Sequence, residues 1–177
     1  MIDHLMPDIP RLYSAIAEWL ACMIFILPFK KRFSKIKTGV IMAVMLVVQS
    51  GFMVVTEDVR LFFWIPCMIV AVFLMLFFIY VSCAIEITDA VYFVLIAFVV
   101  AEFMASIEWQ VACYFRIAQS GVWWKEWSAL ILGYGMISVI LFKILHVHFP
   151  EDGQMEIGWK ECFSAFLIAI SVFAVSN

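Results

Sequence analysis

Hydrophobic residues in this chain fall into six long runs, and short segments between the runs hold most of the charged residues. A helix needs about 20 residues to cross the roughly 30 Å hydrocarbon core of a bilayer, and each run approaches that length. The runs lack the alternation of a barrel strand, and backbone amides in lipid must bond within their own segment. The pattern therefore predicts an all-α polytopic membrane protein, a bundle of six transmembrane helices. The expected helices are residues 13–29, 38–55, 61–82, 90–111, 127–147 and 157–176.

The charged residues between the runs predict the orientation of the bundle. Five of the eleven Lys and Arg residues lie in residues 30–37, KKRFSKIK, between the first two runs. The positive-inside rule places this segment in the cytoplasm. The N-terminus is then expected outside, and an even number of crossings returns the C-terminus to the same side. The first ten residues contain no Lys or Arg, so we expect the first helix to be retained rather than cleaved as a signal peptide.

Composition narrows the classes of function that the chain could have. With 67% hydrophobic and 14% charged residues, residues 1–177 are expected to form one membrane domain without a soluble part. The net charge of −3 gives no indication of nucleic-acid binding. The five cysteines show no paired spacing, and the sequence has no catalytic or nucleotide-binding motif. We therefore expect no metal site, no cofactor and no enzymatic activity.

Three carboxylates inside the predicted helices are the strongest candidates for function. An ionisable side chain in a bilayer costs roughly 3 kcal/mol or more, so it usually faces the bundle interior, water or a partner. Glu102 is the deepest, and its expected role is signal transmission, proton coupling or an interhelical hydrogen bond. Glu18 and Glu108 lie nearer the expected outer surface, where contact with lipid headgroups is an open alternative. The polar groups expected to bond across helices rather than face lipid are Gln49, Ser50, Gln110 and Tyr134.

The two carboxylates of the fourth run do not predict a catalytic pair. Six residues separate Glu102 from Glu108, which is a rotation of about 240° on a helix of 3.6 residues per turn. The two side chains are therefore expected on different faces.

Tryptophans supply the remaining candidates for ligand contact or signal transmission. Three of them cluster at the expected outer end of the fifth run, where an aromatic belt at headgroup level is the more usual explanation than a ligand cage. The four candidates are Trp109, Trp123, Trp124 and Trp127.

Small residues recur every four positions in the first and fourth runs. The two sets are Ala17 and Ala21, and Ala97, Ala101 and Ala105. Small residues at this spacing let two helices approach closely. The pattern favours packing within one chain over a dimer interface.

Several strings in the chain point to a known family. They are residues 10–33 (PRLYSAIAEWLACMIFILPFKKRF), 62–75 (FFWIPCMIVAVFLM), 101–110 (AEFMASIEWQ) and 166–177 (FLIAISVFAVSN). The chain resembles the N-terminal membrane sensor of Firmicutes sensor histidine kinases with a GHKL-type ATPase domain, akin to peptide-pheromone receptors. The resemblance implies a bacterial plasma-membrane location, a homodimer, and an extracellular ligand of unknown identity such as a peptide. It also implies a further crossing and a cytoplasmic kinase domain after residue 177, since this chain has no ATP-binding or phospho-acceptor motif.

Two alternatives stay open. Six-helix substrate-binding subunits of energy-coupling-factor vitamin transporters are of similar length, and some dock a partner through small residues on the first helix, as Ala17 and Ala21 could. Those subunits normally have both termini in the cytoplasm, opposite to the orientation expected here. A membrane assembly subunit whose partners are the lipid bilayer and other proteins, without a ligand, is the second alternative.

Overall fold

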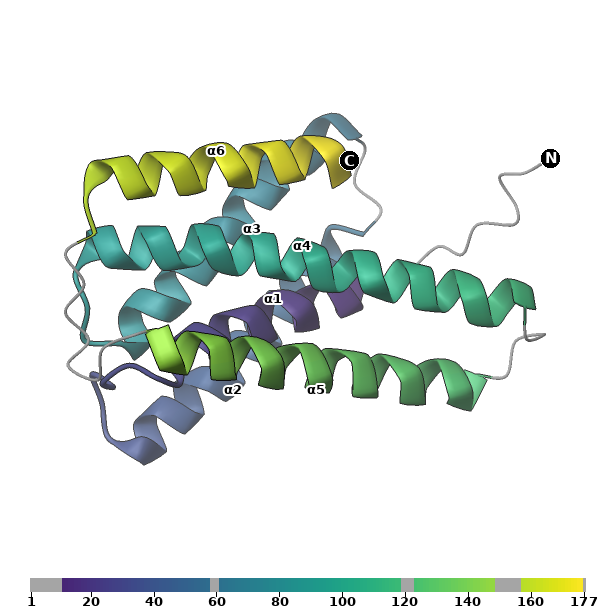
Figure 1. Ribbon diagram of the computed structural model, residues 1–177, viewed down its shortest axis with the longest axis horizontal. Helices are drawn as coiled ribbons and strands as arrows, with labels where there is room; N and C mark the ends of the chain where they lie inside the picture. Colours follow the sequence, from purple (N-terminus) through teal and green to yellow (C-terminus); the bar gives the residue numbers. More distant parts are fainter. Residues whose placement is uncertain (1–10, 58–60, 119–122, 149–156, 177) are drawn as a thin grey trace.

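A computed structural model describes residues 11–57, 61–118, 123–148 and 157–176, which form six helices and contain no named strand (Figure 1). The all-α prediction is therefore confirmed for these ranges. The helices are α1 (Arg11–Ile26), α2 (Lys35–Val55), α3 (Leu61–Ser82), α4 (Ile87–Ala118), α5 (Trp123–His148) and α6 (Trp159–Ser176).

Four of the helices, α2 to α5, contain a segment long and apolar enough to cross a membrane. This agrees with a membrane protein. Helix α1 has 16 residues and, at about 1.5 Å per residue, is about 24 Å long, which is shorter than the hydrocarbon core. Helices α1 and α6 are not among the four candidate crossings.

Helices α1 and α4 form the centre of the bundle. Helix α1 packs against α2, α3, α4 and α5, so other helices enclose it. Helix α6 packs against α4 alone among the described helices. Consecutive helices run in opposite directions, and the start of α1 and the end of α6 lie at the same end of the bundle (Figure 1). The α1–α2 and α3–α4 connections lie together at the opposite end.

Several helix ends differ from the sequence-based prediction. Helix α1 stops at Ile26 rather than at residue 29, because Pro28 disfavours the helical conformation of the residue before it. Helix α4 starts three residues earlier and ends seven residues later than predicted, because residues 112–118 contain no Gly or Pro to stop it. Its 32 residues reach about 48 Å, more than the hydrocarbon thickness. The bounds of α3 match the prediction.

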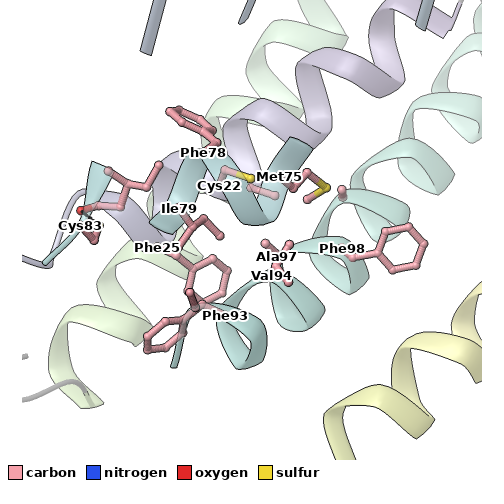
Figure 2. Packing of buried hydrophobic residues seen from close by; sticks show 14 of the residues in the cluster. Cys22, Phe25, Met75, Phe78, Ile79, Cys83, Phe93, Val94, Ala97 and Phe98 are labelled. Atoms are coloured by element: carbon pink, nitrogen blue, oxygen red, sulfur yellow. Dashed lines mark hydrogen bonds between the residues drawn. The ribbon is translucent and has the colours of Figure 1, made fainter. Parts of the chain in front are cut away.

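The largest hydrophobic core lies where α1, α3 and α4 meet (Figure 2). The rings of Phe25 and Phe93 stack at 5.8 Å between centroids, and Ala97 has no exposed surface. Figure 2 shows side chains from all three helices converging on this region. The labelled members are Cys22, Phe25, Met75, Phe78, Ile79, Cys83, Phe93, Val94, Ala97 and Phe98. This packing fixes α1 against α4, which positions the polar groups described below.

Two connections are joined by backbone hydrogen bonds at the end of the bundle that carries the basic segment. The Arg32 N–H donates to the Ser82 carbonyl at 3.1 Å, and the Ala84 N–H donates to the Lys30 carbonyl at 3.0 Å. Lys31 and Cys83 form one isolated antiparallel bridge between the two segments. We call these segments the basic-end clamp: residues 30–32 and 82–84.

Basic side chains reinforce this clamp. The Lys31 ammonium donates to carbonyls at the end of α1, including those of Leu27 at 2.9 Å and Phe29 at 2.7 Å, where a cation is favoured by the helix dipole. The Arg32 guanidinium lies 4.6 Å from the centroid of the Tyr80 ring. Burial lowers the pKa of the Lys31 ammonium. Burial also raises the pKa of the Cys83 thiol, to about 11.

Candidate functional site

Polar side chains on four helices gather in the part of the bundle beyond the hydrophobic core, away from the basic end. Each belongs to a candidate membrane-crossing helix or to α1, which packs against four other helices. We call this set the carboxylate region: Glu18, Gln49, Glu102, Glu108 and Tyr134.

Glu18 joins α1 to α2. The Gln49 side-chain amide donates to a carboxylate oxygen of Glu18, and the two residues are only 3% and 4% exposed, respectively. The prediction that Gln49 bonds across helices is confirmed. A void of about 10 Å³ adjoins the pair, which is at the lower limit for one water molecule. Glu18 is therefore enclosed, and a ligand has no room to contact it in this arrangement.

Glu108 joins α4 to α5. The Tyr134 hydroxyl donates to a carboxylate oxygen of Glu108, which is 2% exposed. The expected interhelical bond of Tyr134 is also confirmed. The same expectation is wrong for Gln110, which is exposed on α4 because no neighbouring helix covers that face, whereas Ser50 of α2 is half-buried. The sequence left open that Glu18 and Glu108 contact lipid headgroups. The structure instead encloses both side chains. The reasons are that α4 continues for ten residues past Glu108 and that α1 is surrounded by other helices.

Glu102 differs from the other two carboxylates because it is only half-buried. It lies at the midpoint of α4 and lines a groove of about 500 Å³ between α4 and α6. Ser106 of α4 and Ser171 of α6 line the same groove, whose other lining residues are apolar. Glu102 also lies within electrostatic range of Glu18. Among the three carboxylates, Glu102 is therefore the one that a ligand or a proton can reach from outside the bundle.

The tryptophan candidates lie apart from this groove. Trp109, Trp124 and Trp127 are each 43–57% exposed, and none of them lines it. The ring of Trp127 contacts Tyr13 of α1 at 5.3 Å between centroids. Exposed tryptophans in the first turns of α5, as Trp124 and Trp127 are, suit an aromatic belt, the interpretation that the sequence favours. The side chain of Trp123 lies outside the described residues.

The alanines that recur every four positions in α1 and α4 pack mainly against other helices of the same chain. Ala17, Ala21 and Ala97 have no exposed surface, Ala101 is 4% exposed, and Ala105 is half-buried. The first four residues lie inside the bundle and so cannot form a dimer contact. Ala17 and Ala21, which the transporter-subunit alternative would use to dock a partner, are among these buried residues.

The described residues contain no group of three or more His, Cys, Asp or Glu that could hold a metal ion. What the carboxylate region offers chemically is two enclosed hydrogen bonds between helices and one accessible carboxylate. Such an arrangement can change helix positions by making or breaking the two bonds.

Sequence reasoning did not find several contacts that fix α1 to its neighbours. Trp19 donates from its indole N–H to the Met42 carbonyl at 3.0 Å, and Arg11 donates to the Thr56 carbonyl at 2.7 Å. The clamp was also missed. The acceptor in each of these hydrogen bonds is a backbone carbonyl. Because every residue has one, the pattern of side chains in the sequence does not show which carbonyl is used.

Comparison of the chain with family models, curated proteins and solved structures gave no match.

Proposed function

We propose that this chain is a membrane-embedded signal-sensing module that passes an extracellular or membrane signal to a cytoplasmic kinase domain of the GHKL type. The module crosses the bacterial plasma membrane six times, with its N-terminus outside. It acts by rearranging helices and has no catalytic step of its own.

The observation that carries this proposal is the pair of enclosed hydrogen bonds formed by Glu18 and Glu108. A carboxylate inside a membrane is costly and is usually retained where it has a function. Each of these carboxylates joins a central helix to a different neighbour, α1 to α2 and α4 to α5. Bonds of this kind distinguish two helix arrangements, one in which they form and one in which they do not, as a two-state sensor requires.

A route for the signal follows from the position of Glu102. A ligand in the groove between α4 and α6 would change the charge around Glu102, and Glu18 lies within electrostatic range of it. The change would alter the bond between Glu18 and Gln49 and hence the position of α2 relative to α1. Helices α1 and α2 both lead into the basic end, which faces the cytoplasm in the proposed orientation.

The proposed topology is tested by reporters fused at two positions. A reporter that is active only in the cytoplasm should be active when fused after Lys37 and inactive when fused after Asn177. Six crossings with the basic segment inside require both results. Activity after Asn177 would contradict the orientation or the number of crossings.

The kinase connection is tested by the coding sequence that follows codon 177. It should encode a further hydrophobic crossing, a helical dimerisation segment and an ATP-binding domain. A stop codon at that position would rule out a kinase in the same chain, and the assembly-subunit alternative would then be preferred.

A further inference from the structure

The segment 30–37 contains five basic residues, and the structure divides them into two groups. Lys31 and Arg32 are used within the chain, since Lys31 caps α1 and Arg32 donates to the Cys83 carbonyl at 3.3 Å. The other three are exposed, and their ammonium groups have no partner among the residues that the structure describes. These free cations are Lys30, Lys35 and Lys37.

An apolar groove lies on the first two turns of α2, beside Lys37. It has a volume of about 370 Å³, and Phe33, Ile36, Val40 and Ile41 line it together with the stem of Lys37. Ile36 is 82% exposed and Val40 is 58% exposed. Water would make such exposure unfavourable, by about 25 cal/mol for each Å² of apolar surface. The groove belongs to a helix that can cross a membrane, so acyl chains would cover it.

We propose that this surface binds one anionic phospholipid, with its phosphate at Lys37 and an acyl chain in the groove, while Lys30 and Lys35 add to the positive field that attracts it. Phosphate oxygens accept charge-assisted hydrogen bonds from ammonium groups, and basic segments next to a crossing attract anionic lipids. The cations alone would accept any anion. The adjoining groove selects an anion that carries a hydrocarbon chain, which separates a phospholipid from free phosphate. This site does not depend on the sensor function proposed above.

The charge requirement is tested by native mass spectrometry of the purified full chain with phosphatidylglycerol and phosphatidylcholine of equal chain length. The wild type should prefer phosphatidylglycerol. The triple variant K30Q/K35Q/K37Q should lose this preference by roughly a hundredfold, which is on the order of fivefold for each lysine. The control variant K125Q/K143Q/K160Q removes the same charge from other helices and should stay within about threefold of the wild type.

The groove requirement is tested separately with V40F, which fills the groove without changing the charge. It should weaken the binding of long-chain phosphatidylglycerol several-fold and leave the weak binding of inorganic phosphate unchanged. All substituted positions except Lys125 are exposed, so helical content by circular dichroism should be the same in every variant. Equal losses in the two triple variants, or inorganic phosphate competing as well as the lipid, would overturn the proposal.

Discussion

The basic-end clamp and the carboxylate region both hold helices together, but they do so with different groups. At the clamp, two backbone hydrogen bonds join the α1–α2 connection to the α3–α4 connection, and basic side chains add to them. In the carboxylate region the interhelical hydrogen bonds described by the structure come from side chains, those of Gln49 and Tyr134.

This difference separates a fixed end from an adjustable region. Backbone bonds persist whatever the side chains are, so the clamp should tolerate substitution and stay in place when helices move. A side-chain bond to a carboxylate is lost when one partner is changed or protonated differently. The carboxylate region is therefore the part of the molecule where helix positions can change, and the clamp is the part that holds the α1–α2 and α3–α4 connections together.

The largest expected effect concerns the reactivity of the two regions. Burial raises the pKa of the Cys83 thiol from 9.0 to about 11, so its thiolate at neutral pH should be about a hundredfold scarcer than for an ordinary cysteine. Because a raised thiol pKa favours the protonated form, alkylation by a maleimide should rise about tenfold per pH unit up to about pH 11. The measurement compares single-cysteine variants that retain Cys83 or the half-buried Cys113 of the opposite half. A Cys83 rate at pH 7.5 equal to that of Cys113 would show that the clamp is open.

The next effect concerns stability in the carboxylate region. Tyr134→Phe removes the donor to Glu108 and leaves that carboxylate enclosed, which should lower the free energy of unfolding by about 1–2 kcal/mol. Steric trapping in bicelles measures this change. Tyr114→Phe is the matched control, because Tyr114 is 57% exposed on α4, and it should change stability by less than about 0.5 kcal/mol. Equal effects in the two variants would mean that the bond contributes nothing.

A smaller effect is expected at the clamp. Arg32→Ala removes the contact with the Tyr80 ring and the bond to the Cys83 carbonyl, but the two backbone bonds stay in place. The free energy of unfolding should fall by about 0.5–1 kcal/mol, the usual range for an exposed cation–π contact. The same steric-trapping assay applies. A loss greater than that of Tyr134→Phe would reverse the contrast between the two regions.

The smallest effect on stability is expected for Glu102. Glu102→Gln keeps the size and the hydrogen-bonding capacity, and the side chain is only half-buried, so stability should change by less than about 0.5 kcal/mol. Glu102→Leu should insert into the membrane at least as well as the wild type. Signalling output in cells should nevertheless change in both variants. Unchanged output in both would reduce Glu102 to a residue that only lines the groove.

The parts of the fold that depend on hydrophobic length were predictable from the sequence. The bounds of α3 are correct because its apolar run begins directly after the charged segment 57–60 and extends to the polar residue Ser82. The interhelical bonds of Gln49 and Tyr134 were predictable because an amide or a hydroxyl in an apolar helix needs a partner. The same rule was wrong for Gln110, which is exposed, because the sequence does not show which face of a helix a neighbour covers. The extension of α4 to Ala118 was not, since a helix can continue into the aqueous phase without any change in its apolar pattern.

The arrangement of the site was less predictable than the helices. Depth along a helix can be read from the sequence, and Glu102 does lie at the midpoint of α4. Burial depends on which helices surround a residue, and it is Glu108 and not Glu102 that is enclosed. The clamp left no pattern in the sequence, because its bonds join backbone groups of two connections that are about 50 residues apart.

Distances between spin labels at the two ends of the bundle test the contrast between the regions most directly. In a cysteine-free background, one pair of labels at Val55 of α2 and Ser128 of α5 reports on the end beyond the carboxylate region. A second pair at Val40 of α2 and Phe77 of α3, both exposed, reports on the helices next to the clamp. Pulsed electron paramagnetic resonance in nanodiscs should show that Tyr134→Phe shifts or broadens the first distance distribution and leaves the second unchanged. Equal changes in both distributions, or a change confined to the second, would contradict a fixed clamp and an adjustable carboxylate region.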